Sequence, residues 1–169
     1  TNGRGILPPG HPLAVPFSPS LEPVRRLVLA ADVVLGVGTE CGQTDYDMYD
    51  VSPFPQPHGL IRIDIDRDQI QRTLRPEIPL LGDAVATMTA LLAAIGDDGT
   101  VDAEVMARGA TAAEAACDVT YAALTPAMQR QVGFLEVIRE TLPEAIVVGD
   151  STRLSTPATW GSTRHARGA

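Results

Sequence analysis

The sequence contains no lysine, two cysteines and few aromatic residues, and all 13 of its cationic residues are arginine. The absence of lysine excludes Schiff-base lysine chemistry and the lysine of a P-loop. No apolar run reaches the roughly 18 residues that span a membrane. No basic segment followed by an apolar one marks a secretory signal. We therefore expect a soluble, cytoplasmic protein with no membrane partner.

Metal ligands are equally scarce. Cys41 and Cys117 cannot form a structural zinc site by themselves, and in the cytoplasm we expect both to stay reduced. The histidines are scattered, and no two of them have the spacing of metal ligands on a helix. The acidic residues between 45 and 50 lack the EF-hand spacing and its closing glutamate. The sequence therefore predicts no metal-binding residues.

The charge balance is acidic, with 21 Asp and Glu against 13 cationic residues and a net charge of -8. Phosphate backbones attract clustered cations, so this balance argues against a nucleic-acid partner. With 44% hydrophobic and 20% charged residues, the composition allows a packed core. A length of 169 residues fits one domain, or one domain and part of a second.

The first half of the chain predicts alternating helices and strands. Residues 32–38 form a continuous β-branched run that ends in glycine, which is typical of a strand buried on both faces of a parallel sheet. Residues 60–66 alternate apolar and polar side chains, which is the period of a strand. Asp83 and Gly96 are suitable caps for a helix between them. We expect an α/β fold with a partial Rossmann-like parallel sheet flanked by helices. The expected helices span residues 21–31, 68–73 and 84–95, and the expected strands span residues 32–38, 60–66 and 78–81.

The second half is organised differently. Residues 97–125 are rich in alanine and predict a helical linker without firm boundaries. Thr125 and Pro126 are typical of a helix start, and Pro143 ends that helix. A buried strand is expected at 145–150. The chain therefore divides into residues 1–96, a linker at 97–125, and the beginning of a second α/β domain at 126–169.

Candidate ligand-binding residues lie at the ends of the first two expected strands. Gly36 and Gly38 let a backbone come close to a ligand, and ligands of open α/β sheets bind at the carboxyl ends of strands. Tight packing is the alternative explanation for these glycines. Asp64 and Asp66 have the position of a carboxylate that accepts from a ribose hydroxyl. Either carboxylate can instead cap the helix that follows.

A further candidate follows the last expected strand. Asp150, Ser151 and Thr152 come directly after it, and hydroxyls and backbone amides at such an edge can bind phosphate. The sequence has no Gly-x-Ser-x-Gly nucleophile elbow, and Ser151 has no evident base nearby. We identify no catalytic residue in this chain.

Several segments together resemble the thiamine-diphosphate-dependent 2-oxo acid decarboxylases and acetolactate synthases. They occur in the order of that family, across nearly the whole chain. The segments are Gly3–Pro8 with His11–Leu13, Ala31–Gly38, Ile63–Asp66 (Ile-Asp-Ile-Asp), Leu81–Ala84 and Pro143–Asp150. Glu40–Asp47 and Asp150–Thr152 are similar to a less common branch, the guanidino-oxopentanoate decarboxylases.

The resemblance implies a fold, cofactors and partners. Residues 1–96 would be the C-terminal part of the central nucleotide-binding-like domain, and residues 126–169 the start of the thiamine diphosphate-binding domain. The intact enzyme would use thiamine diphosphate and magnesium, act on a small 2-oxo acid and form a homo-oligomer. Members hold FAD or ADP in the central domain, so a nucleotide would lie across Gly38, Thr39 and Asp64. Thr39–Gln43 replaces the Arg-Phe-Asp-Asp-type loop of flavin-bearing synthases, which argues against FAD.

Differences from the family define the remaining expectations. Members have three α/β domains, and this sequence contains neither the first domain, with the glutamate that activates thiamine, nor the Gly-Asp-Gly...Asn segment that holds the metal. We therefore expect a fragment that is inactive by itself. One alternative is a stand-alone, non-catalytic nucleotide-binding module that uses Gly36, Gly38, Asp64 and Asp66. Another is a remnant that only packs against a partner.

Overall fold

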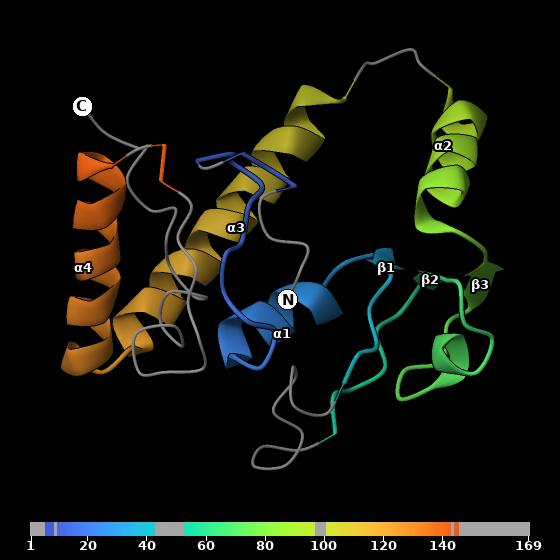
Figure 1. Ribbon diagram of the computed structural model, residues 1–169, viewed down its shortest axis with the longest axis horizontal. Coiled ribbons are helices and arrows are strands. Elements are labelled where there is room, and N and C mark those ends of the chain that lie inside the picture. Colours follow the sequence, from blue (N-terminus) through green and yellow to red (C-terminus); the bar gives the residue numbers. More distant parts are fainter. Residues whose placement is uncertain (1–5, 9, 43–52, 97–100, 143, 146–169) are drawn as a thin grey trace. The chain divides into compact units, whose positions relative to one another are not determined.

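The computed structural model describes residues 6–8, 10–42, 53–96, 101–142 and 144–145 (Figure 1). The chain forms two compact units, one of residues 1–24 with 104–169 and the other of residues 25–103. Each unit has its own buried cluster of apolar side chains. Within the described part, residues 6–20 contain no helix or strand, as their prolines predict.

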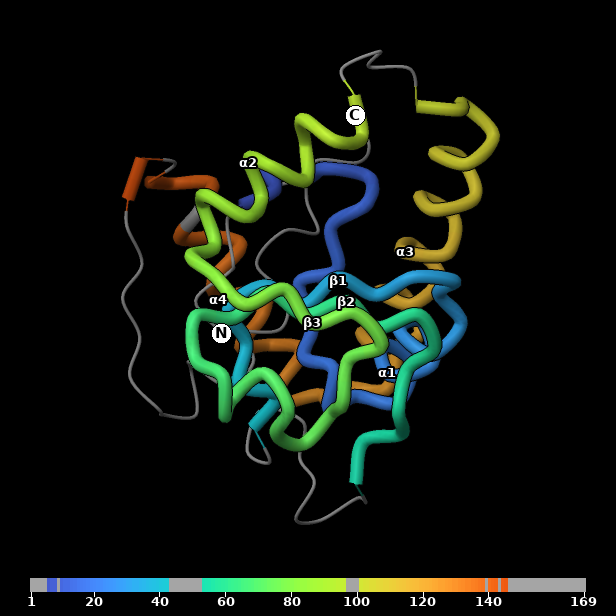
Figure 2. The backbone as a smooth tube through the Cα atoms, turned by 90° about the vertical axis from the view of Figure 1, so that its right-hand side faces the viewer, coloured from blue at the N-terminus to red at the C-terminus, as the bar shows by residue number. Residues whose placement is uncertain are grey.

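The unit of residues 25–103 is built on a three-stranded parallel sheet. Its strands are β1 (Val34–Val37), β2 (Leu60–Asp64) and β3 (Ile78–Leu81), in the order β1-β2-β3. Figure 2 shows the three strands side by side. Val34 pairs with Leu60, and Ile61 pairs with Ile78. The predicted α/β fold is confirmed, including the pairing of the first two strands.

One face of this sheet packs on a core. Cys41, Phe54, Leu60 and Leu74 form its buried centre, and Val28 and Leu29 of helix α1 (Glu22–Leu29) pack against it. Arg25 of the same helix lies over the Phe54 ring, with 5.0 Å from the guanidinium carbon to the ring centroid. This is the distance of a cation–π contact.

The opposite face of the sheet is only partly covered. Side chains alternate along a strand, so Leu35, Val37 and Ile78 point away from the core just described. Their exposed fractions are 41%, 39% and 52%. The sequence predicted a first strand buried on both faces. This prediction was wrong for the described part of the chain, because its elements cover one face of β1 and leave much of the other accessible.

Helix α2 (Ala84–Ile95) begins and ends at the predicted caps. The Asp83 carboxylate accepts a hydrogen bond from the Ala86 amide at 2.9 Å, and Gly96 ends the helix with a φ of 85°. Its apolar face forms but is not buried, since Val85, Leu92 and Ile95 are 75%, 66% and 73% exposed. The caps therefore fix the helix boundaries without help from packing on this face.

The expected helix at 68–73 is reduced to one 3-10 turn, η1 (Gln69–Gln71). Arg72 is already extended, with a φ of -80° and a ψ of 144°. Thr73 follows with a φ of 65°, in the left-handed region. A helix cannot continue through these two backbone conformations, so the prediction was too long.

In its described part, the other unit is largely helical after residue 103. Helix α3 (Ala103–Ala123) is continuous where the sequence predicted a linker without firm boundaries. It buries a narrow stripe of small side chains: Ala113, Ala116 and Thr120. Helix α4 (Pro126–Thr141) begins after Thr125, whose hydroxyl accepts from the Met128 amide at 3.3 Å. Phe17, Val24, Leu124 and Val132 form the buried centre of this unit.

Among the described residues, no helix is both long enough and apolar enough to cross a bilayer.

Candidate functional site

The carboxyl ends of the three strands meet at one edge of the sheet. Hydrogen bonds of the ladder continue past the strands, from the Gly38 amide to the Ile63 carbonyl at 2.9 Å and from the Gly82 amide to the Asp64 carbonyl at 2.9 Å. Gly38, Asp64 and Gly82 therefore lie at the same level, immediately beyond β1, β2 and β3. Ligands of open parallel sheets bind at this kind of edge.

Gly36 and Gly38, which the sequence predicted to serve the same purpose, differ in backbone conformation and surroundings. Gly38 has a φ of 57°, and a Cβ built there would have no atom of the described residues within 4 Å. Gly36 has no such backbone requirement, and its Cβ would make ordinary contacts with Thr39 Cγ2 at 3.4 Å and Arg62 Cγ at 3.7 Å. Gly38 thus combines a conformation that favours glycine with open space above the backbone, whereas at Gly36 the structure leaves room for a methyl group.

Thr39 is held inside the turn after β1. Its hydroxyl oxygen accepts from the Cys41 amide at 3.2 Å, and its carbonyl oxygen accepts from Arg62 Nη2 at 2.7 Å. Cys41 has a φ of 50° and is 3% exposed. The segment from Gly38 to Cys41, which we call the β1 turn, therefore contains two residues in the left-handed region and is held by both a buried side chain and hydrogen bonds.

The two aspartates after β2 have different surroundings. Asp66 Oδ1 accepts from the amides of Asp68 at 2.7 Å and Gln69 at 3.2 Å, so this carboxylate caps the 3-10 turn. These two backbone N–H groups favour the charged form and hold the pKa of Asp66 below its ordinary value of 3.8. The capping role that the sequence left open is thus realised at Asp66.

The Asp64 carboxylate accepts fewer backbone hydrogen bonds than that of Asp66. Its Oδ1 accepts from the Asp66 amide at 2.9 Å, and its Oδ2 makes no hydrogen bond within the described part of the chain. The side chain is half-buried at the sheet edge, at the level of Gly38. One carboxylate oxygen is therefore available to a ligand hydroxyl beside the turn at Gly38.

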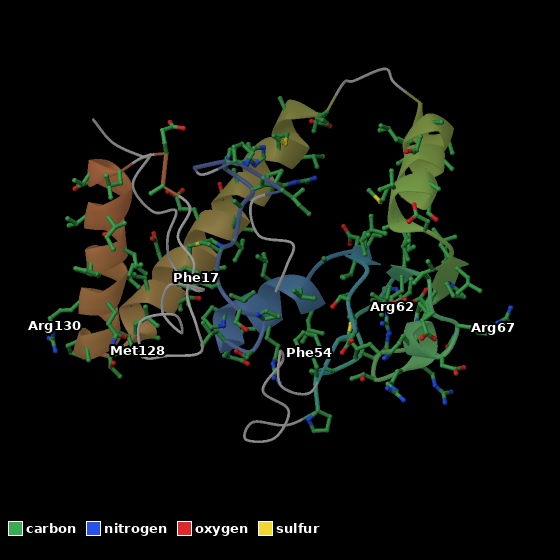
Figure 3. All side chains as sticks on the ribbon, in the orientation of Figure 1. Phe17, Phe54, Arg62, Arg67, Met128 and Arg130 are labelled. Atoms are coloured by element: carbon green, nitrogen blue, oxygen red, sulfur yellow. The ribbon has the colours of Figure 1, made fainter. Side chains whose placement is uncertain are left out.

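Sequence reasoning missed Arg62. The apolar-polar alternation of residues 60–66 gives Arg62 no role beyond a polar position in the strand, and the residue is 1% exposed. Its guanidinium donates to the carbonyl oxygens of Arg72 at 2.8 Å, Leu74 at 3.0 Å and Thr39 at 2.7 Å. Figure 3 shows the contrast with Arg67, whose side chain points outward. The signal available in the sequence was an arginine set between isoleucines in the strand next to a glycine-rich one.

The remaining predicted site residues, Asp150, Ser151 and Thr152, lie outside the described residues, as does most of the strand expected before them. Within the described ranges, no three His, Cys, Asp or Glu side chains gather as a metal site would require. Cys41 and Cys117 do not form a disulfide bond with each other.

Comparison with known proteins identifies relatives of the chain. Residues 1–91 match the thiamine pyrophosphate enzyme central domain. The chain is 32% identical to a probable 2-ketoarginine decarboxylase of Pseudomonas aeruginosa over 154 residues, which are 90% of this chain and 26% of the relative. It is 33% identical to a probable acetolactate synthase large subunit of Methanocaldococcus jannaschii over 95 residues, 55% of this chain and 16% of that relative. No solved structure matches significantly.

The chain thus spans about a quarter of the length of the first of these relatives and less of the second. The similarity to the decarboxylase continues well beyond the central domain, because it covers 154 residues whereas the family match ends at residue 91.

Proposed function

The chain belongs to the thiamine pyrophosphate enzyme family through its central domain, and we propose that the intact protein is a thiamine-diphosphate-dependent enzyme acting on 2-oxo acids. Both relatives carry names of such enzymes. In this family of reactions the cofactor stabilises the carbanion left when a 2-oxo acid loses carbon dioxide. Magnesium is proposed as the metal that anchors the diphosphate.

Decarboxylation of a guanidino-bearing 2-oxo acid is the reaction we favour over acetolactate-type carboligation. The observation that supports this choice is the extent of the similarity. The match to the probable 2-ketoarginine decarboxylase covers 90% of the chain, and the match to the probable acetolactate synthase covers 55%. Cofactor-dependent release of carbon dioxide by the intact protein, compared between a guanidino 2-oxo acid and pyruvate, tests the choice.

Within that enzyme, we propose that residues 25–96 bind a nucleotide at the carboxyl edge of the sheet. The observation that carries this proposal is made among the described residues: there is open space over Gly38, at the level of an Asp64 carboxylate oxygen that makes no hydrogen bond. A backbone without a side chain lets a phosphate or ribose approach, and the carboxylate accepts from a ribose hydroxyl. The other two predicted contacts on this side of the site are Gly36, which lies in β1, and Thr39, which lies in the β1 turn. ADP is favoured over FAD, since Thr39–Gln43 differs from the flavin-contacting loop of the synthases.

Asp64 and Asp66 offer a matched test of this site. We expect Asp64→Asn to weaken ADP binding by about tenfold or more, because a hydrogen bond to a charged group contributes about 1.5–3 kcal/mol. Asp66→Asn changes the same charge two residues away, on a carboxylate already used as a cap, and should leave affinity nearly unchanged. Titration calorimetry of the intact protein with ADP and with FAD provides the measurement. Equal losses in the two variants would contradict the assignment of Asp64.

The second domain is proposed to begin in this chain and to be completed outside it. Asp150, Ser151 and Thr152 are the proposed contacts to the diphosphate of thiamine. They would supply a few hydrogen bonds of about 1–3 kcal/mol each, against an association cost on the order of 4 kcal/mol or more. We therefore expect the 169-residue chain to show no detectable thiamine diphosphate binding and no turnover by itself.

A stand-alone nucleotide-binding module remains the second candidate. The same edge supports it, because Gly38 and Asp64 both belong to the unit of residues 25–103. ADP binding by a protein whose coding sequence adds no further domain would favour this module. Cofactor-dependent carbon dioxide release would favour the enzyme.

A further inference from the structure

We propose that Arg62 is a positioning residue, which fixes the β1 turn and thereby shapes the nucleotide site. This inference rests on the proposed function of the sheet edge and adds to it a residue that does not itself contact the nucleotide. Arg62 lies in the middle of β2, the central strand, and is 1% exposed. Nothing in its sequence pattern or in the family resemblance assigned it a role.

The bonding of Arg62 is unusual for a buried cation. Within the described residues it pairs with no carboxylate, and its three hydrogen bonds all go to backbone carbonyl oxygens. Burying a charge is costly unless it is well hydrogen-bonded. The guanidinium, with donors in a fixed fork, reaches several acceptors at once, which a lysine ammonium on a flexible stem cannot reproduce.

The three acceptors belong to two loops beyond the strand. The Thr39 carbonyl lies in the β1 turn. The Arg72 and Leu74 carbonyls lie in the segment after η1, where Thr73 has a φ of 65° and the Leu74 amide bonds back to the Arg72 carbonyl at 2.8 Å. Arg62 therefore ties the loop after β1 to the loop that follows Asp64 and Asp66.

The backbone conformation of the β1 turn depends on contacts such as the hydrogen bond from Arg62. Cys41 is a non-glycine residue with a φ of 50°, a conformation that persists where the surroundings determine it. Its side chain packs in the core and its amide donates to the Thr39 hydroxyl, and Arg62 fixes the Thr39 backbone. Removing the Arg62 contact would free the Thr39 carbonyl and let the turn relax away from Asp64.

The test compares Arg62→Lys with Arg67→Lys in the intact protein. Both variants keep the charge, but Arg67 is exposed and lies outside the turn. Hydrogen exchange would be measured on the Cys41 and Leu74 amides, and the Kd for ADP by calorimetry. We expect Arg62→Lys to speed exchange at both amides and to raise the Kd by about tenfold, the consequence of losing charge-assisted bonds. Arg67→Lys should change neither.

A purely structural role is distinguished by two further readouts. The Ile63 amide in the centre of β2 should keep its protection in Arg62→Lys, whereas global destabilisation would expose it as well. The effects of Arg62→Lys and Gly38→Ala on the Kd should be less than additive, because both act through the β1 turn. Additive effects, or a wild-type Kd in a folded Arg62→Lys protein, would overturn the proposal.

A wrong assignment of the nucleotide site would give a different experimental result from a wrong assignment of Arg62. If the wild type binds neither ADP nor FAD, the proposed function of the sheet edge is wrong, and with it the use of Arg62 for nucleotide binding. Unchanged exchange at Cys41 and Leu74 in Arg62→Lys would overturn the positioning of the loops even if the wild type binds ADP.

Discussion

Gly59→Ala should be among the most damaging single substitutions in the unit of residues 25–103. Gly59 immediately precedes β2 and has a φ of 59°. A Cβ built there would lie 2.4 Å from the Asp32 carbonyl oxygen and 3.3 Å from the Val33 Cα. Both of these atoms are backbone, so neither can move aside by a side-chain rotation.

The expected loss in the free energy of unfolding for Gly59→Ala has two parts. The left-handed conformation costs an alanine about 1–2 kcal/mol. Forcing a methyl group into a packed contact costs about 1–3 kcal/mol more. The backbone around Gly59 has little freedom to yield, because its carbonyl accepts from the Val34 amide at 3.2 Å and its amide donates to Glu77 Oε1 at 2.8 Å. We therefore expect the free energy of unfolding to fall by about 2–5 kcal/mol.

Gly38→Ala is the matched control. Gly38 has nearly the same φ, 57°, but in the part of the chain that the structure describes no atom lies within 4 Å of its Cβ position. It should lose only the conformational part, about 1–2 kcal/mol. Urea unfolding followed by circular dichroism measures both variants. If Gly59→Ala is no less stable than Gly38→Ala, the close approach of Gly59 to Asp32 is wrong.

Three further substitutions test other parts of the structure. Asp66→Asn should lower the free energy of unfolding at neutral pH. Because the pKa of Asp66 in the folded state lies below 3.8, the difference between the variant and the wild type should shrink as the pH falls from 3.8 through the folded-state pKa. Equal stabilities at pH 7 would contradict the capping role of Asp66. Thr125→Ala should cost about 1 kcal/mol through loss of the α4 N-cap, whereas Thr141→Ala, which removes an exposed hydroxyl bonded to the Val137 carbonyl, should cost much less. We expect the 169-residue chain to associate with itself through the exposed apolar face of α2. Leu92→Gln, at a 66% exposed position of that face, should lower the sedimentation coefficient of the chain, and an unchanged coefficient would contradict the role of this face.

The parallel sheet could be predicted because its signals are local. Short β-branched runs ending in glycine mark β1, and alternation marks β2, so element type and order followed from the sequence. The caps of α2 were equally predictable, since Asp83 and Gly96 act on their own backbone neighbours. These features depend on a few adjacent residues rather than on distant packing.

The errors arose where distant groups decide the outcome. Arg62 occupies a polar position in the alternating pattern of β2. Three carbonyl oxygens from residues 39, 72 and 74 make its burial favourable, and no local rule brings these oxygens together. The extent of α3 was hidden by its composition, because alanine suits both a buried stripe and an exposed helix surface. The exposed face of α2 likewise depends on what packs on it, which periodicity alone does not reveal.

At the candidate site, the sequence predicted the edge but not the division of roles along it. Asp64 and Asp66 are equivalent in the sequence pattern, and only the backbone path after β2 makes one of them a cap and leaves an oxygen of the other uncommitted. Gly36 and Gly38 likewise cannot be distinguished in the sequence, and the structure distinguishes them by the positive φ of Gly38. The roles of Asp150, Ser151 and Thr152 stay predictions.

The most direct test of the proposed reaction is release of carbon dioxide from 5-guanidino-2-oxopentanoate by the intact protein. We predict release that requires both thiamine diphosphate and magnesium, and that is faster than release from pyruvate at equal concentration. The 169-residue chain, assayed in parallel, should not exceed a buffer blank. Release by the intact protein without the cofactor, or no release from any 2-oxo acid with it, would contradict the proposal.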